Sequence, residues 1–145
     1  MVYTYRKTNF RPRKPVRSFR DLEVYQKALE GAVMISKKIL PILEQTNYLF
    51  KDDMIKCSLG IPRKIAEAHS ARFDSKPSGL DILNEVMKNC NQIVVYLEEV
   101  RDIYSEQVER VLVEELIRRY IYNRSKIFHL YKAWEKFSIK RSLAP

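Results

Sequence analysis

The sequence predicts an all-α protein: an antiparallel up-down-up-down four-helix bundle with a flexible basic arm at its N-terminus. The 145 residues include only three glycines, which leaves few sites for the tight hairpins that join strands. Apolar residues recur at three- and four-residue spacings over long stretches, as they do on the buried face of a helix. Four such stretches with short connections are typical of a bundle, and a chain of this length can bury one core.

The first element is the arm, residues 1–17, which contains Pro12 and Pro15 and shows no helical spacing. Ser18 is the expected N-cap of the first helix, since Asp21 and Glu23 then place acids in its first turn. We expect this helix to run from Phe19 to Gln45. Pro41 predicts a kink or an early end there, because proline lacks a backbone donor.

The second helix is expected from Leu49 to Phe73. Its apolar stripe consists of Met54, Cys57, Ile61, Ile65 and Ala68. Gly60 and Pro62 lie inside this stretch and predict a bend near its middle. Residues 74–79 carry Asp, Ser, Pro and Gly and are expected to form a loop.

The third helix, expected from Leu80 to Tyr104, has the most regular spacing in the chain. Its stripe is formed by Leu83, Val86, Cys90, Ile93, Leu97, Val100 and Tyr104. The fourth helix is expected from Gln107 to Phe137, with Leu112, Leu116, Tyr120, Ile127, Tyr131 and Trp134 on its seam. The bundle then occupies residues 18–137, and residues 138–145 form a short tail.

The net charge of +9 is concentrated at the two ends of the chain. Residues 1–17 hold six cations and no acid, and residues 118–145 hold eight cations and one acid. The stretch between them therefore carries a net −4. Clustered cations release counterions from nucleic acid and predict salt-sensitive binding. The alternative is that basic ends only keep the protein soluble.

Aromatic residues interleaved with these cations favour nucleic acid. Tyr3, Tyr5 and Phe10 lie near the start, and Tyr120, Tyr122, Phe128, Tyr131, Trp134 and Phe137 lie near the end. Some of them would stack on unpaired bases, although most of those in the last helix are expected to face the core. The predicted binding residues are Arg11, Arg13, Lys14 and Arg17 in the arm and Arg118, Arg119, Arg124, Lys126, Lys132 and Lys136 in the last helix. Arg63 and Lys64, beside Pro62, either line a channel between subunits or are solvated.

Enzymatic chemistry is not expected. The two histidines, His69 and His129, fall in different helices, and no zinc-ligand spacing or phosphate-cradling Gly-rich loop occurs. The acidic pairs diverge by about 100° on a helix and are expected to be solvated. They are Asp52–Asp53, Glu98–Glu99 and Glu114–Glu115. We therefore expect no catalytic residue, no metal and no cofactor.

Two cysteines and the apolar pattern bear on location. Cys57 and Cys90 are expected to be buried free thiols, typical of a reducing cytosol, with a disulfide as the alternative. The N-terminus has no apolar signal core, and no segment reaches the ~18 apolar residues of a membrane span. No expected helix pairs a strongly basic face with a bulky lipid-seeking one. A cytoplasmic protein without a membrane partner is expected.

Two segments resemble a known family. Residues 19–28 read FRDLEVYQKA, and residues 58–67 read SLGIPRKIAE. They are similar to the F-x-D-L-x-V-[WY]-Q-x-A and S-I-P-x-N-I-A-E-G motifs of the 23S rRNA intervening-sequence proteins. The resemblance covers roughly residues 18–105. It departs from the family at Gly60, Lys64 and Ala68, where the family has Ser, Asn and Gly.

The resemblance implies a four-helix bundle that is usually a homopentamer, has no established enzymatic activity and favours RNA as partner. In fold and charge the chain also resembles the accessory variability determinant of diversity-generating retroelements. That protein is a basic pentamer that binds a reverse transcriptase and nucleic acid. An adaptor for a reverse transcriptase is therefore the alternative function, with an acidic protein surface meeting the cations.

Overall fold

The chain is built from helices. The computed structural model describes the backbone of residues 16–143, and the side chains there except those of Lys76 and residues 138–143. The elements are η1 (Phe19–Asp21), α2 (Glu23–Met34), η2 (Ile35–Ile39), α3 (Leu40–Leu43), α4 (Lys51–Asp74), α5 (Lys76–Ile103) and α6 (Arg110–Leu143). No β-strand occurs between residues 16 and 143, so the predicted all-α class is confirmed.

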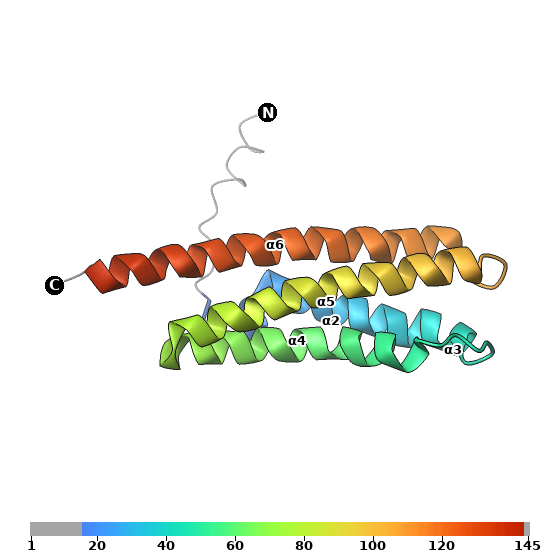
Figure 1. Cartoon of the computed structure of the whole chain (residues 1–145), viewed down its shortest axis with the longest axis horizontal. Helices are drawn as coiled ribbons and strands as arrows, with labels where there is room; N and C mark the ends of the chain where they lie inside the picture. Colours follow the sequence, from blue (N-terminus) through green and yellow to red (C-terminus); the bar gives the residue numbers. More distant parts are fainter. Residues whose placement is uncertain (1–15, 144–145) are drawn as a thin grey trace, which may run out of the picture.

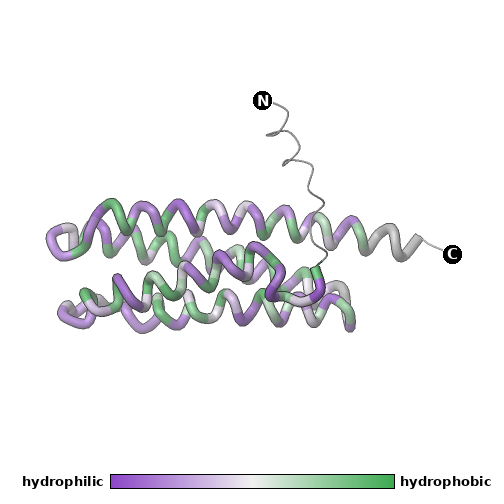
Figure 2. The backbone as a smooth tube through the Cα atoms, turned by 180° about the vertical axis from the view of Figure 1, so that it is seen from behind, coloured by the Kyte–Doolittle hydropathy of each residue, from purple (hydrophilic) through white to green (hydrophobic). Residues whose placement is uncertain are grey.

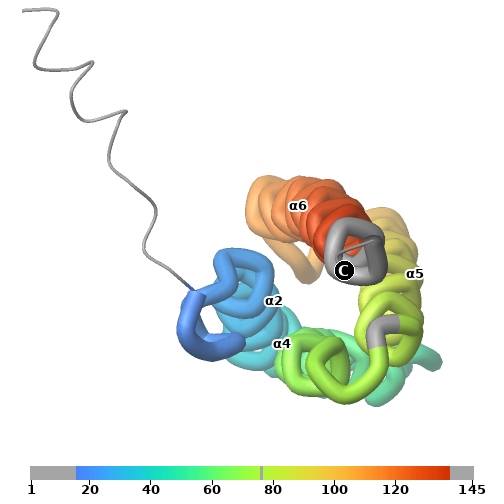
Figure 3. The backbone as a smooth tube through the Cα atoms, turned by 90° about the vertical axis from the view of Figure 1, so that its left-hand side faces the viewer, coloured from blue at the N-terminus to red at the C-terminus, as the bar shows by residue number. Residues whose placement is uncertain are grey.

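The long helices lie side by side (Figure 1). α4 packs on α5 and α5 packs on α6, while α2 contacts both α4 and α6 and so completes a ring of four (Figure 3). Apolar and polar residues alternate along each long helix (Figure 2), the pattern of helices with one buried face. One apolar core runs through all four segments.

Ser18 is an N-cap, as predicted, but it heads a short 3₁₀ turn. Its Oγ accepts a hydrogen bond from Arg20 N–H (3.2 Å), and the Asp21 carboxylate accepts from the N–H groups of Arg17 (2.9 Å) and Ser18 (3.2 Å). These backbone donors, Arg17 first, hold the pKa of Asp21 below its usual value. Leu22 is extended, so the regular helix α2 begins only at Glu23.

The first helical segment ends near Pro41, where a kink or an early end was expected. The chain widens into a π-helix over Ile35–Ile39, in which Leu40 N–H donates to Ile35 O, five residues back. Pro41 follows in the first turn of the four-residue helix α3. Proline has no backbone N–H, and the loss of that hydrogen bond costs less in a first turn than in a helix interior. The segment ends at Leu43, two residues before the predicted end.

Helices α4 and α5 provide most of the large core side chains. The predicted stripe of α5 is fully buried from Leu83 to Val100, and Tyr104 is half-buried. In α4, Met54, Ile61 and Ile65 are fully buried. Pro62 is also buried, inside a helix that continues on both sides of it, so neighbouring side chains offset the lost backbone bond.

Two predicted boundaries are wrong. The expected loop at residues 74–79 is reduced to Ser75, because Pro77 occupies the first turn of α5, where a helix needs no donor. A Cβ on Gly79 would lie 2.9 Å from the Cβ of Arg72, so glycine permits this close packing. The expected tail is also largely helical, since α6 continues to Leu143.

Candidate nucleic-acid interface

Helix α6 buries one side of its surface and exposes cations on the other. Its inward side consists of Val113, Leu116, Tyr120, Asn123, Ile127 and Trp134, all buried. Leu112 and Tyr131, expected on this seam, are only half-buried, and the polar residue Asn123 lies there instead. Arg118, Ser125, His129 and Lys132 lie on the opposite side and are exposed. The seam therefore fixes the direction in which the cations project.

An open cavity of about 310 Å³ lies between α2 and α6. It is lined by Lys27 of α2 and by Glu115, Arg118, Arg119 and Tyr122 of α6. The structure thus brings together two predicted residues, Arg118 and Arg119, and adds Lys27. Three cations and one aromatic ring around an open cavity match the groups that phosphates and bases bind.

Lys27 lines the cavity because two contacts hold α2 against α6 within about one turn of it. Asn123 Nδ2–H donates to Val24 O (3.1 Å) across the seam. Gly31 lies against Tyr120, since a Cβ there would be 2.8 Å from the Tyr120 hydroxyl. These two contacts set the α2 register. The sequence did not indicate Lys27, because only the pairing of the two helices places it beside Arg118.

Arg119 is partly neutralised by acids. Its guanidinium lies 3.4 Å from a Glu30 oxygen on α2 and 3.5 Å from a Glu115 oxygen one turn earlier on α6. Both distances are long for charge-assisted hydrogen bonds, and all three side chains are partly exposed. Such pairs contribute little to stability and exchange readily for another anion.

Two exposed rings on α6 carry cations over their faces. Lys126 Nζ is 5.4 Å from the centroid of Tyr122, and Lys132 Nζ is 5.6 Å from that of Phe128. Tyr122 is 50% exposed and Phe128 is 42% exposed. Phe137 is also exposed, so only part of the aromatic set faces the core. The prediction that most of these rings are buried is wrong.

The other predicted residues do not form one surface. Arg17 precedes η1, Arg63 lies on α4, and Arg124 and Lys136 lie on α6 about 18 Å apart along its axis; all four are exposed. Lys132 is paired with Glu135 at 3.5 Å. Arg11, Arg13 and Lys14 lie outside the described residues. The candidate interface is therefore the α2–α6 cavity, continued along α6 by Lys126.

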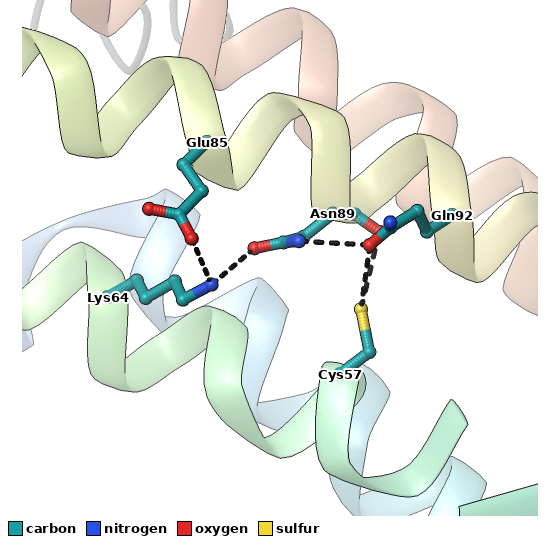
Figure 4. A network of polar contacts seen from close by, with 5 residues as sticks. All are labelled: Cys57, Lys64, Glu85, Asn89 and Gln92. Carbon is teal, nitrogen blue, oxygen red and sulfur yellow. Dashed lines mark hydrogen bonds and ion pairs between the residues drawn. The ribbon is translucent and has the colours of Figure 1, made fainter. Parts of the chain in front are cut away.

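Lys64 belongs to a polar network between α4 and α5 (Figure 4). Its Nζ donates to Glu85 Oε1 (2.7 Å) and to Asn89 Oδ1 (2.9 Å), and Asn89 Nδ2–H donates to Gln92 Oε1 (3.0 Å). The thiol of Cys57 donates to that same Gln92 oxygen (3.7 Å). Lys64 is thus engaged within the protein, while Arg63 beside it is solvated.

The other acidic residues and the two cysteines are either solvent-exposed or packed within the protein. Asp52 and Asp53 are exposed, and Glu99 accepts a hydrogen bond from the Tyr48 hydroxyl (2.7 Å). Burial, and then Glu99, raise the pKa of Tyr48 far above its usual value. Cys57 and Cys90 are free, and burial raises the pKa of Cys57 to about 11. Within the described residues, no three potential ligands gather as a metal site requires.

None of the described helices contains an apolar stretch long enough to cross a bilayer. Comparison of the chain with protein-family models, with curated proteins and with solved structures found no match in any of the three.

Proposed function

We propose that this chain is a non-enzymatic nucleic-acid-binding protein that favours RNA and folds as an antiparallel up-down-up-down four-helix bundle. The helix order supports the topology. Ser75 alone separates α4 from α5, and residues 104–109 separate α5 from α6, while both helix pairs pack on each other. Long helices joined so briefly pack only by reversing direction.

The α2–α6 cavity is the observation that carries the proposed activity. Arg118 and Arg119 offer planar guanidinium groups that bind phosphate oxygens in pairs. Tyr122 is exposed beside them and gives a face on which an unpaired base stacks. Recognition of backbone and base faces without base edges predicts weak sequence dependence and strong salt dependence.

The resemblance to the rRNA intervening-sequence family supports the fold more than the ligand. Its two motifs supply core residues, among them Leu22, Val24, Ser58, Ile61 and Ile65, all buried. Residues of this kind specify how helices pack. The proposal that RNA is the ligand rests on the family together with the basic cavity, and the cytoplasmic location is proposed on the same footing.

Self-association is part of the proposal. Several large apolar side chains are exposed on the described helices: Leu29, Val33, Leu59, Val95, Ile121 and Phe128. Burial of such side chains between copies would support an oligomer. The number five comes from the resemblance, and light scattering of the purified protein measures it.

An electrophoretic mobility shift with a structured RNA at low and moderate salt tests the activity. The wild-type protein should bind at low salt and lose most of its affinity at the higher salt concentration. The double variant K27Q/R118Q should bind more weakly, whereas the control K56Q, an exposed lysine of α4, should bind as the wild type does. Absence of any shift at low salt would exclude nucleic-acid binding by the purified protein.

The alternative is an accessory protein that binds a reverse transcriptase in a diversity-generating retroelement. Exposed Phe128 beside Lys132, with exposed Ile121 about two turns earlier on α6, favours it, because an apolar and basic surface suits an acidic protein partner. In that case the purified chain binds RNA poorly and co-purifies with a protein. A neighbouring reverse-transcriptase gene with template and variable repeats would support it.

A further inference from the structure

A second group of basic and aromatic side chains lies where the last turns of α4 meet α6. The cluster consists of His69, Arg72 and Phe73 of α4 and Trp134 of α6. We refer to these four residues as the α4-end cluster. It lies about 18 Å along α6 from Tyr122, at 1.5 Å for each of the intervening residues. It is therefore separate from the α2–α6 cavity.

Arg72 is a cation held by rings and not by acids. Its guanidinium carbon is 4.4 Å from the centroid of Phe73 and 4.9 Å from that of Trp134. None of the ion pairs among the described residues includes Arg72. Its Nε is buried and has no hydrogen-bond partner. A partly buried donor of this kind is costly unless an acceptor meets it.

His69 provides a second buried polar atom in the same place. The residue is 8% exposed, its ring is 5.5 Å from that of Phe73, and its Nε2 has no hydrogen-bond partner. Burial, and then the charge of Arg72, lower the pKa of His69, which favours the neutral imidazole. The neutral ring adds no second positive charge beside Arg72.

The start of α5 holds Arg72 in position. A Cβ on Gly79 would lie 2.9 Å from the Cβ of Arg72 and 3.0 Å from its Cα, so the two helices touch at this point. The first atoms of the arginine side chain are therefore packed against α5, while its guanidinium carbon lies over the rings of Phe73 and Trp134. A donor held in place by packing loses less conformational entropy on binding than a free one.

We propose that the α4-end cluster binds a nucleoside monophosphate group, either free or at the end of a strand. The terminal N–H groups of the Arg72 guanidinium donate to the phosphate oxygens. His69 supports the Phe73 ring edge-on, with 5.5 Å between the ring centroids. The base stacks on Phe73, which is 65% exposed while Trp134 is 8% exposed. Because only one ring of the cluster is exposed, a terminal group fits it better than a continuous backbone does.

The single tryptophan of the chain makes the cluster directly observable. The indole N–H resonance of labelled full-length protein is followed during titration with uridine monophosphate, with uridine and with inorganic phosphate. Uridine monophosphate should shift the Trp134 signal to saturation, and uridine should not do so at the same concentrations. R72Q should bind about tenfold more weakly, as expected for loss of one charge-assisted hydrogen bond. K56Q, in the same helix, should bind normally.

A second arm compares a short RNA carrying a 5′-phosphate with the same RNA carrying a 5′-hydroxyl. The strand-end form of the inference rests on the proposed function, and it expects tighter binding of the phosphorylated RNA by the wild type but not by R72Q. Binding of uridine monophosphate without binding of either RNA would leave a free-nucleotide site and refute the proposed function. The inference would be overturned, with the proposed function left standing, by two results together. The two RNAs would bind equally well, and uridine monophosphate would either leave the Trp134 indole signal unchanged or shift it equally in the wild type and R72Q.

Discussion

Two seams of the molecule, α4–α5 and α2–α6, are packed from different side chains. The first joins large branched residues such as Ile61, Ile65 and Leu97, all fully buried. The second joins Ala28, Gly31 and Ala32 of α2 to the larger residues of α6. Small residues let two helices approach closely, but they bury little apolar area. The α4–α5 seam therefore contributes more hydrophobic stabilisation than the α2–α6 seam does.

Polar groups follow the same division. Along α4–α5, Lys64 meets acceptors on Glu85 and Asn89. Along α2–α6, the Tyr120 hydroxyl and Asn123 Oδ1 are buried with no hydrogen-bond partner, as are Arg72 Nε and His69 Nε2 in the α4-end cluster. Departures from full polar satisfaction concentrate at functional or strained places. The unpaired groups therefore lie near the two places where we propose binding, while the middle of the α4–α5 seam maintains the fold.

The largest effect is expected from the hydrophobic seam. Ile93→Ala removes a fully buried side chain of α5 and should lower the free energy of unfolding by about 2–5 kcal/mol. Denaturant unfolding followed by circular dichroism measures it. Val95→Ala, an exposed position on the same helix, should change it by less than about 0.5 kcal/mol. Equal effects of the two variants would contradict the assignment of α5 to the core.

A smaller loss is expected at the close approach of the two helices in the binding seam. Gly31→Ala places a Cβ 2.8 Å from the buried Tyr120 hydroxyl and 3.0 Å from its Cζ. Overpacking costs about 1–3 kcal/mol, and the better helix propensity of alanine returns about 1 kcal/mol of it. A net loss is expected, and adding Tyr120→Phe should recover part of it. A G31A protein more stable than the wild type would show that α2 can move away freely.

Cations of the cavity should affect RNA binding without affecting the fold. The plot of log Kobs against log salt has a negative slope, and its magnitude should become smaller by about 0.7–0.9 for each phosphate that K27Q or R118Q can no longer neutralise. Fluorescence anisotropy with labelled RNA at four salt concentrations measures the slope. K64Q should leave it unchanged, because Lys64 is engaged with Glu85. A change in K64Q as large as in R118Q would extend the binding surface to α4–α5.

Removal of an unpaired hydroxyl should be neutral or favourable. Tyr120→Phe deletes a buried oxygen that has no hydrogen-bond partner, so the free energy of unfolding should stay the same or rise by up to about 1 kcal/mol. Thermal unfolding detects the change. A decrease above about 1 kcal/mol would mean that the hydroxyl is satisfied in solution, for example by a bound water.

The smallest effect is expected from the polar network of the other seam. Lys64→Met removes an ion pair whose side chains are 32% and 56% exposed, and such pairs contribute about 0–1 kcal/mol. The decrease in the free energy of unfolding should be smaller at high salt than at low salt, because salt screens a partly exposed ion pair. A decrease of several kcal/mol would show that the network, and not the apolar stripe, secures α4 on α5.

The sequence predicted best those features that depend on a single helix, such as its buried face and its cap. The three-four spacing of α5 predicted its buried residues from Leu83 to Val100, and the residue types around Ser18 predicted a cap. The sequence was less successful at boundaries. Pro77 and Gly79 signal a loop, yet proline also fits a first helical turn and glycine a close helix packing. Beyond Phe137 the sequence offers no glycine or proline until Pro145, so nothing there stops the helix.

The candidate site depends on relations between helices, which spacing along one helix does not reveal. Clustered charge predicted Arg118 and Arg119, but Lys27 becomes relevant only because Gly31 and Val24 fix α2 against α6. The same limit applies to Lys64, whose acceptors lie on α5. Charge patterns therefore predicted where cations cluster along the chain, and packing decided which of them line one cavity.

The π-helix at Ile35–Ile39 lets the first helical segment hold one residue more than a regular helix would between its buried side chains. Ile35, Ile39 and Leu43 are four residues apart and fully buried, although two such steps in a regular α-helix would rotate the last side chain by about 80°. The wider turn absorbs that drift. Deleting one residue, such as Ser36, would leave the three buried side chains at the three- and four-residue spacing of a regular α-helix. The chain beyond would keep its orientation toward the core, so this segment should tolerate a one-residue deletion as well as substitution of exposed Lys37 and Lys38.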